Sequence, residues 1–347
     1  MADTAENSGR EKAVTIKTVA ERAGVSIATV SRVLNNPESV TEEKRVRVAE
    51  IIDELQYVPN PIARALGNNR VETIAIVIPN ITNPCLSVIV YGIMDELENA
   101  GYSALIFDTQ EDGDKADSFI RNLPKKLISG VVVMTECGRS GPMREVAQVT
   151  PMAVIDCPEC DVPVDNFSSD DVRGMLRLVQ YLVDFGHTDI GLLAGDFTTH
   201  SGPRRVRTFI DALEAESVPY KKENVVTCGW NMNGGDSAFR KLMQRETPPT
   251  AVIAASDVIA IGALGAAHTL GLQVPADVSI AGFDNSPNGA YAVPPLTTLK
   301  YPGTGLGRMA ARSVLRQLEE GPKPPVRKVL PLELLERESC GPCRQKS

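Results

Sequence analysis

The feature that most constrains this chain is a pair of short helix signals joined by a glycine turn, between residues 15 and 35. In the first signal, apolar residues recur at helical spacing: Ile16, Val19, Ala20 and Ala23. Gly24 follows where a left-handed turn can end the helix, and Ser26 suits the N-cap of a second helix. Two helices joined by so tight a turn predict a helix-turn-helix, a unit that places its second helix in the major groove of DNA.

The second helix has an outward face suited to reading base edges. Its apolar stripe is Val30, Val33 and Leu34. Its outward residues are Ile27, Ala28, Thr29, Ser31 and Arg32, and none of them is acidic. Because large acidic side chains on this face would repel phosphate, their absence here favours a DNA-binding domain, which we place at residues 14–58.

A third helix completes this domain. Thr41 has N-cap character, and Glu42 with Glu43 lies in the first turn, where the helix dipole favours anions. We expect its apolar stripe to consist of Val46, Ala49, Ile52 and Leu55.

The run Pro59-Asn60-Pro61 breaks the chain after this helix. Asn60 suits an N-cap and Pro61 a first helical position, so Ile62 to Leu66 forms a helix of less than two turns. Such a helix is far shorter than the ~12–15 residues needed for stability in isolation. We therefore expect residues 59–70 to be a hinge or linker, and the polar residues 1–13 to be a disordered tail.

From Thr73 onward, short apolar runs alternate with helical patterns. The predicted strands are Thr73–Ile78, Ser103–Phe107, Gly130–Met134, Met152–Asp156, Asp189–Ala194, Ala251–Ala255 and Val278–Phe283. Helical patterns between them include Val88–Ala100, Val172–Asp184 and Val258–Leu270. Continuous apolar strands separated by helices predict parallel sheets covered on both faces, and the length fits an α/β core of two Rossmann-like lobes.

Proline-rich passages mark the candidate crossovers between these lobes: Cys157–Val164, Val293–Pro302 and Gly321–Val326. Three crossovers predict a clamshell like that of periplasmic binding proteins. We expect lobe 1 to span about 71–157 and 300–322, lobe 2 about 163–294 and 326–338, and residues 339–347 to form a tail.

The charge distribution agrees with a DNA-binding end. The chain has a net charge of −8, yet residues 1–70 hold 10 basic and 10 acidic residues. All the excess acid therefore lies in the remaining residues, and residues 12–70 alone carry a net charge of +2. So small an excess predicts that affinity for DNA depends on dimerisation and on the placement of individual cations such as Lys17, Arg22, Arg32 and Arg64.

Several motifs together resemble the lactose/galactose/purine repressor family. They are TIKTVAERAGVS, TVSRVLN, YVPNPIARAL, NITNP, AASDVIAIGAL, VPADVSIAGFDNS and PPLTTLKYP, in family order from residue 15 to about 338. The resemblance implies a dimer bound to a palindromic operator, with the hinge folding in the minor groove and Leu66 wedged between base pairs. The alternative for Leu66 is an exposed linker residue. The implied DNA contacts are Thr15, Lys17, Ser26, Ile27, Ala28, Thr29, Ser31, Arg32, Asn35, Tyr57, Asn60, Ala63 and Leu66.

The same resemblance implies a sugar-like effector held between the lobes. Its predicted contacts are Asn83, Leu86, Asp156, Arg205, Trp230, Ser256 and Asp284. Carboxylates accept hydroxyl protons, a guanidinium donates a planar fork, and an indole face packs on C–H groups. Simpler roles stay open, because strand-end aspartates often cap helices, a single tryptophan is often core, and the arginines near 205 fit a solvated face. Cys85-Leu86 and Ser256 depart from the family pattern, so the effector's identity does not carry over.

Seven cysteines without an export signal indicate free thiols rather than disulfides. Cys157/Cys160 and Cys340/Cys343 have CxxC spacing, which leaves a redox or zinc input as an alternative. We expect no cofactor and no metal.

The remaining patterns argue against enzymes and membrane proteins. The three histidines have no triad or HExxH spacing, no phosphate-binding GxxxxGK[ST] loop is present, and no run approaches the ~18 apolar residues of a membrane span. A sugar carrier would need a signal peptide and has no use for residues 15–67. We expect a cytoplasmic, dimeric, ligand-controlled repressor; a corepressor-dependent or activating regulator would have all of these sequence features too.

Overall fold

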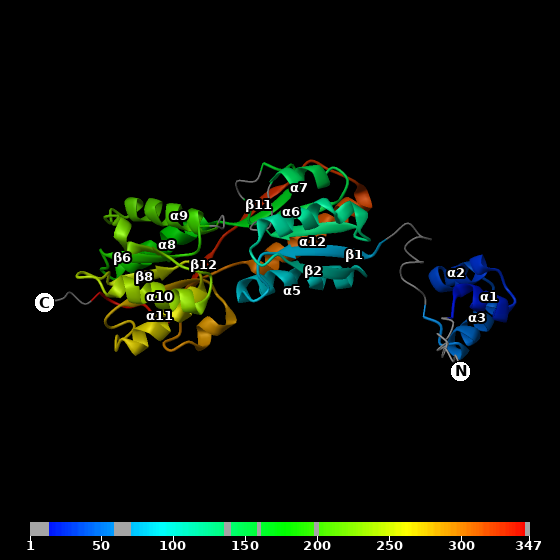
Figure 1. The fold of residues 1–347 in the computed structure, drawn as a ribbon, viewed down its shortest axis with the longest axis horizontal. Helices are drawn as coiled ribbons and strands as arrows, with labels where there is room; N and C mark the ends of the chain where they lie inside the picture. The colour runs from blue at the N-terminus through cyan, green and yellow to red at the C-terminus, as the bar shows by residue number, and fades with distance from the viewer. Residues whose placement is uncertain (1–13, 59–70, 135–139, 158–160, 198–200, 344–347) are drawn as a thin grey trace, which may run out of the picture. The chain divides into compact units, whose positions relative to one another are not determined.

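A computed structural model describes residues 14–58, 71–134, 140–157, 161–197 and 201–343, except for the side chain of Asn35. The chain divides into two compact units, Met1–Val71 and Glu72–Ser347, which are described separately (Figure 1). The predicted hinge at 59–70, with Asn60, Ala63 and Leu66, lies outside the described residues.

The first unit is a three-helix domain within residues 14–58. Its elements are α1 (Ile16–Ala23), α2 (Ile27–Asn35), the short 3₁₀ turn η1 (Pro37–Ser39) and α3 (Glu42–Glu54). Gly24 ends α1 with a φ of 66°, in the left-handed region, and the Ser26 hydroxyl accepts the Thr29 N–H at 3.1 Å as the N-cap of α2. Both predicted signals of the helix-turn-helix are thereby confirmed.

The predicted apolar stripe of α3 is wrong at its first two positions. Val46 is 45% exposed and Ala49 is exposed, whereas Val48 is fully buried. The core side of α3 runs through Val48, Ile51, Ile52 and Leu55. The predicted stripe advances by three residues each time, so each side chain points about 60° away from the previous one around the helix. Mixed steps of three and four residues, as in the observed core side, keep the side chains on one face of the helix.

The second unit contains two lobes, each built on a mostly parallel sheet of six described strands. Lobe 1 has the strand order β11-β5-β4-β3-β1-β2 and lobe 2 the order β12-β10-β9-β8-β6-β7. The lobe 1 strands are β1 (Thr73–Ile78), β2 (Ser103–Asp108), β3 (Gly130–Met134), β4 (Met152–Ile155), β5 (Asp165–Ser169) and β11 (Arg327–Leu330). The lobe 2 strands are β6 (Ile190–Ala194), β7 (Val225–Thr227), β8 (Ala251–Ala254), β9 (Ser279–Asp284), β10 (Thr297–Lys300) and β12 (Glu333–Leu335).

Helices cover both faces of each sheet, as expected for parallel strands (Figure 1). The helices of lobe 1 are α5 (Pro84–Asn99), α6 (Gly113–Arg121), α7 (Ser140–Val146) and α12 (Gly303–Glu320). Those of lobe 2 are α8 (Asp171–Asp184), α9 (Ser201–Ala215), α10 (Met232–Met243) and α11 (Asp257–Thr269). In lobe 1, α5 packs on α12 and α6 on α7; in lobe 2, α8 packs on α9 and α10 on α11. The predicted two-lobed α/β architecture is confirmed.

All seven predicted strands are present, each within one residue at its ends. The strands that the sequence pattern did not predict are β5, β7, β10, β11 and β12. They are short or polar: β5 reads DNFSS and β11 reads RKVL. Their place in the sheets depends on long-range pairing, such as that of β11 with β5, rather than on an apolar run.

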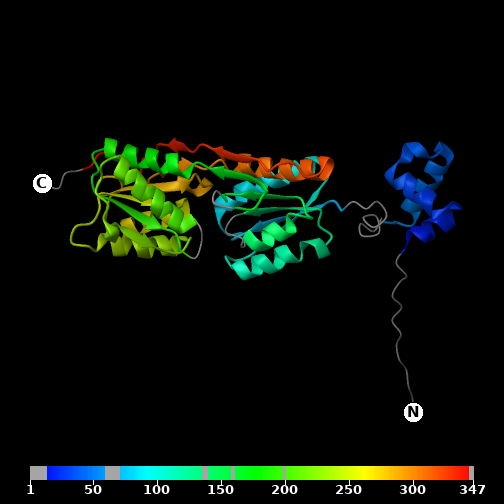
Figure 2. The ribbon, with the colours of Figure 1, turned by 90° about the horizontal axis from the view of Figure 1, so that it is seen from above.

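Two of the three predicted crossovers are wrong. The strands before and after Cys157–Val164, β4 and β5, both lie in lobe 1, and so do α12 and β11, which flank Gly321–Val326. Within the described residues, the chain crosses between β5 and α8, between β10 and α12, and between β11 and β12. Only the second of these crossings falls in a predicted passage, at Tyr301-Pro302. Figure 2 shows the C-terminal segment, in red, passing along both lobes.

The predicted C-terminal tail is also wrong for residues 339–343, which pack against lobe 2. Ser339 is fully buried and Cys340 is 6% exposed. The Ser339 carbonyl accepts the Ile280 N–H at 2.9 Å, and the Cys343 N–H donates to the Phe185 carbonyl at 2.8 Å. Backbone hydrogen bonds, invisible in the polar composition of this segment, hold it in place.

None of the helices that the structure describes has the length and apolar character needed to cross a membrane.

Candidate functional site

The helix-turn-helix presents the predicted DNA-reading surface to solvent. Ile27 is 47% exposed and Ala28 and Arg32 are also exposed on α2, whereas Thr29 and Ser31 are half-buried. Among the described residues, Arg32 has no ion-pair partner, which leaves its guanidinium available to a base edge or a phosphate. The reading helix is therefore held by its buried stripe and offers a cation outward.

The predicted contacts at the edge of this surface are placed by helix capping. Thr15 is the exposed N-cap of α1, with its hydroxyl accepting the Thr18 N–H at 3.4 Å. Lys17 is exposed in the first turn, and its ammonium lies 3.9 Å from the carboxylate of Glu21. Tyr57 differs from the prediction: it is 9% exposed and packs in the domain core, so we remove it from the contact surface.

A cleft lies between the two lobes, at the carboxyl ends of the parallel strands. All seven predicted effector residues line it: Asn83, Leu86, Asp156, Arg205, Trp230, Ser256 and Asp284. Lobe 1 supplies the first three and lobe 2 the other four. The structure thus brings the predicted residues together, while their contact with a ligand stays a prediction.

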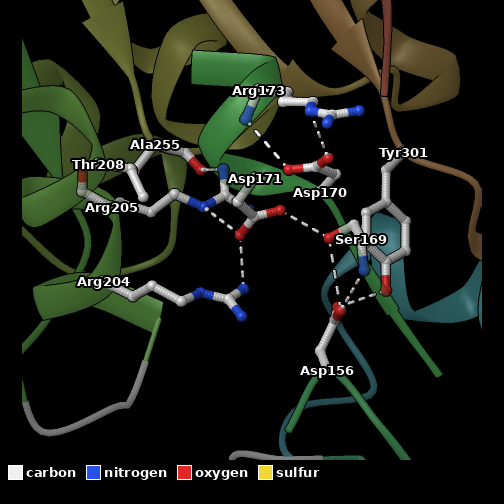
Figure 3. A network of polar contacts seen from close by, with 10 residues as sticks. All are labelled: Asp156, Ser169, Asp170, Asp171, Arg173, Arg204, Arg205, Thr208, Ala255 and Tyr301. Atoms are coloured by element: carbon white, nitrogen blue, oxygen red, sulfur yellow. Dashed lines mark hydrogen bonds and ion pairs between the residues drawn. The ribbon is translucent and has the colours of Figure 1, made fainter. Parts of the chain in front are cut away.

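Asp156, directly after β4, is the centre of a polar network at the floor of the cleft (Figure 3). Its carboxylate accepts the Ser169 N–H at 3.1 Å and the hydroxyl of Tyr301. The Ser169 hydroxyl lies 3.4 Å from the same carboxylate but donates its proton to Asp171 at 2.6 Å. Ser169 ends β5 and Tyr301 follows β10, so Asp156 accepts hydrogen bonds from residues at two of the three crossovers.

Arg205, on α9, is buried at 6% exposure and is fixed on three sides. Its Nη1 donates to the Ala255 carbonyl at 3.1 Å, and its Nε lies 3.4 Å from the Asp171 carboxylate. The guanidinium carbon lies 3.2 Å from the centroid of the Phe283 ring. The neighbouring Arg204 donates to the same Asp171 carboxylate at 2.5 Å (Figure 3). One aspartate therefore pairs with two arginines behind the cleft wall.

The two strand-end aspartates share an unusual backbone and a perturbed acidity. Asp156 has a φ of 57° and Asp284 a φ of 132°, in the region that side chains rarely adopt. Burial raises the pKa of Asp156, and the negative charge of Asp171 adds to the effect. Burial also raises the pKa of Asp284 well above its usual range, with a further contribution from Asp257. Strain and desolvation together at a cavity are typical of a binding site.

Three residues that the sequence analysis missed complete the site. Cys85 and Tyr301 line the cleft, and Asp171 pairs with the arginines behind it. Burial raises the pKa of both the Cys85 thiol and the Tyr301 hydroxyl well above their usual values, so both are neutral hydrogen-bonding groups. Asp171 reads in sequence as an ordinary acid in the first turn of a helix, and only the tertiary fold places it beside Arg204 and Arg205.

The described residues give little support to a metal or redox input. They contain no group of three or more His, Cys, Asp or Glu side chains placed to hold a metal ion. The Cys340 thiol donates to the Ile280 carbonyl at 3.4 Å, and burial raises its pKa to about 12, which makes it a poor nucleophile at neutral pH. Cys160 lies outside the described residues.

Comparisons with known proteins agree with both units. Residues 15–60 match the family model of bacterial regulatory proteins of the lacI family, and residues 179–340 match that of periplasmic binding protein-like domains. The HTH-type transcriptional regulator DegA of Bacillus subtilis is 34% identical, covering 94% of this chain and 98% of its own.

Two solved structures extend the likeness to the whole fold. The Lac repressor dimer bound to operator and the anti-inducer ONPF has a TM-score of 0.86 at 26% identity, covering 95% of this chain and 100% of its own. The regulator CelR in complex with cellobiose has a TM-score of 0.71 at 29% identity, covering 94% and 99%. The chain belongs to the lacI family of bacterial regulatory proteins, and it is a DNA-binding transcriptional regulator with a periplasmic-binding-protein-like domain.

Proposed function

We propose that this regulator is a cytoplasmic repressor that leaves its operator when a small sugar-like effector occupies the cleft between its lobes. The observation that supports this most strongly is the cleft itself, since seven residues chosen from sequence meet there on two lobes joined by three crossovers. The cleft also combines apolar lining residues with a few polar groups that converge from both lobes, as small-molecule sites do. The relatives CelR and Lac repressor were solved with a disaccharide and an anti-inducer respectively.

On the DNA side, Arg32 with Ile27 and Ala28 reads base edges in the major groove. Ser31 and Asn35 contact phosphate, and Leu66 wedges into the centre of the operator. Two copies of the domain on one duplex require a palindromic operator, because a two-fold dimer repeats each contact on the second half-site.

The homodimer needs an apolar surface, and lobe 1 offers one. Tyr91 and Met94 on α5 are 65% and 44% exposed, and Leu105 on the neighbouring edge strand β2 is 43% exposed. Ile106 beside it is 36% exposed. Large apolar side chains gathered on adjacent elements are typical of a protein interface.

Ligand control follows from the crossovers. A ligand that contacts Asp156 in lobe 1 and Arg205 in lobe 2 favours whichever lobe arrangement brings both within reach. Because Asp156 is bonded to Ser169 and Tyr301 at two crossovers, that preference acts where the lobes join. Ligand binding thereby shifts the population between operator-competent and operator-free dimers.

The test is a thermal-shift screen of the full chain against sugars, sugar acids and nucleosides. A ligand at a hundred times its Kd stabilises the folded state by about 2.7 kcal/mol, which raises Tm by a few degrees. Hits are then added to a complex of the protein with DNA selected from a random library. Release of the DNA supports induction, and tighter binding identifies a corepressor instead. Ligand control is contradicted if no compound raises Tm, or if the compounds that raise Tm leave DNA binding unchanged.

A further inference from the structure

We infer that Asp171 is the positioning residue through which the cleft acts on the junction of the two lobes. Its carboxylate joins Arg205, on the wall of the cleft, to Ser169, at the crossover between β5 and α8. This inference rests on the proposed function, since it names how the same cleft controls operator binding.

Asp171 lies behind the cleft wall. Its side chain is 3% exposed, and it is not one of the described residues that line the cleft. It is also not needed to cap α8, because the Asp170 carboxylate already accepts the Arg173 N–H at 3.1 Å as the N-cap. Burying a carboxylate costs free energy unless it is paired, so the place of Asp171 in the fold depends on its side-chain partners.

The two oxygens of the Asp171 carboxylate contact different parts of the molecule (Figure 3). Oδ1 accepts the Ser169 hydroxyl proton at 2.6 Å, at the crossover. Oδ2 accepts a hydrogen bond from Arg204 at 2.5 Å and lies 3.4 Å from the Nε of Arg205, and both arginines belong to α9. Because a carboxylate is rigid and planar, a movement of Asp171 that follows the arginines also changes its bond to Ser169.

The network continues from Ser169 to a second crossover. The Ser169 N–H donates to Asp156 Oδ1 at 3.1 Å, and Asp156 Oδ2 accepts the hydroxyl proton of Tyr301. Tyr301 lies between β10 and α12, and its N–H donates to the Asp284 carbonyl at 3.2 Å. Hydrogen bonds and ion pairs therefore join the wall of lobe 2 to lobe 1 through two of the three crossovers.

The contact between Arg205 and Asp171 is the weakest link of this network. The Arg205 Nε is buried and has no hydrogen-bond partner among the described residues, so its approach to Asp171 at 3.4 Å is an ion pair without a hydrogen bond. The contacts of Asp171 with Arg204 and Ser169 are shorter, at 2.5 and 2.6 Å. Because Arg205 lines the cleft, a ligand that binds its guanidinium changes the weakest link first.

The intact network stabilises one arrangement of the lobes, the operator-competent one. A ligand that draws Arg205 away from Asp171 weakens the hold of Asp171 on Ser169 and thereby loosens the crossover. The lobes then shift toward the operator-free arrangement, as a change of population between two states. Substitutions that break the network should therefore weaken operator binding in the same way, although none of these residues belongs to the DNA-binding domain.

The test measures DNA binding by the full-length protein without any effector, on an operator selected by the wild type from a random library. Ser169→Ala removes the hydroxyl that binds Asp171 and leaves the backbone N–H bond to Asp156 in place. Asp171→Asn keeps the shape of the side chain without its charge. We expect each to weaken operator binding by at least about fivefold, the lower end of allosteric couplings, with binding to random DNA unchanged. The double variant should lose no more than either single one, since both interrupt the same path.

Two neighbouring residues supply matched controls. Ser168→Ala removes a buried hydroxyl from the other face of β5, and Asp170→Asn keeps an N-cap on α8. Both should bind the operator as the wild type does.

An operator affinity that is unchanged in Ser169→Ala and Asp171→Asn overturns the inference. An equal loss on random DNA also overturns it, because that result would show general damage to the fold. If Asp171→Asn fails to fold, Ser169→Ala still gives the answer. Failure of the effector screen would contradict ligand control, whereas this comparison uses no effector and tests only the path through Asp171.

Discussion

The two units of this protein carry their functional groups in opposite ways. In the helix-turn-helix domain, the core is apolar, and the predicted DNA contacts Ile27, Ala28 and Arg32 lie exposed on one helix. In the two-lobed unit, the predicted effector residues are buried or half-buried. Asp156 and Arg205 are bonded to other groups of the protein, and Asp171 pairs with both Arg204 and Arg205. The domain that reads a macromolecule displays its side chains, whereas the domain that encloses a small molecule must first satisfy its charges internally.

This difference predicts where substitutions act. A change on the DNA surface removes an external contact and leaves the fold intact. A change in the polar network at the cleft leaves a buried charge without its partner, so it affects both the stability of the fold and ligand binding. The following predictions separate the two cases, from the largest effect to the smallest.

Asp171→Ala should lower the free energy of unfolding of the two-lobed unit by about 3–5 kcal/mol, because it leaves two guanidiniums without their shared carboxylate. Urea unfolding followed by Trp230 fluorescence reports this unit, since Trp230 is the single tryptophan. The control is Asp170→Ala, which removes the N-cap of α8 and should cost only ~1 kcal/mol. Equal losses for the two variants would contradict the central role of Asp171.

Val48→Ala should destabilise the DNA-binding domain by about 2–3 kcal/mol, from lost burial plus the cavity left behind. Val46→Ala, two residues earlier on the same helix, should change stability by less than about 0.5 kcal/mol, since Val46 is 45% exposed. Circular dichroism during thermal unfolding measures both, in the transition that Trp230 fluorescence does not report. A larger loss of stability for Val46→Ala than for Val48→Ala would contradict the structure and support the apolar stripe that the sequence predicted for α3.

Arg32→Ala should weaken binding to the selected operator by about 1–3 kcal/mol, the usual contribution of one base-reading side chain, with unfolding unchanged. Lys17→Ala should instead weaken operator and random DNA alike and reduce the salt dependence, as a phosphate contact does. Fluorescence anisotropy on both DNAs separates the two. An Arg32→Ala loss of equal size on random DNA would make Arg32 a phosphate contact.

The smallest predicted effect is a pH dependence from His187, which ties the C-terminal segment to lobe 2. Its ring nitrogens contact the Thr250 hydroxyl at 2.9 Å and the Gly341 carbonyl at 3.0 Å. Burial lowers the pKa of His187 below its usual 6.5, so the unfolded chain takes up the proton more readily. Its contribution to stability is therefore complete above pH 6.5 and is lost as the pH falls below that value.

Urea unfolding across pH 5–8 measures this dependence. His187→Gln should flatten the acid side of the profile, and His268→Gln, at an exposed position on α11, should keep the wild-type shape. Matching profiles for wild type and His187→Gln would show that other groups control acid stability.

The sequence predicts the features that depend on neighbouring residues better than those that depend on distant ones. Local signals sufficed for the helix-turn-helix, because Gly24 and Ser26 act on the adjacent backbone. Apolar runs located the central strands, and the resemblance located the cleft residues. The polar strands β5 and β11, and hence the true crossovers, depend on pairing between residues 161 positions apart, such as Asn166 and Arg327. The Asp171 pairs and the Tyr301 contact likewise exist only in the folded chain.

Ligand control of DNA binding is tested most directly by one titration with two readouts. An effector found in the screen is added to the wild-type protein bound to labelled operator, while Trp230 fluorescence and DNA anisotropy are followed together. We predict that the tryptophan signal saturates with the same midpoint at which the operator is released. A cleft that fills, as Trp230 reports, while operator affinity stays unchanged would contradict ligand control of DNA binding.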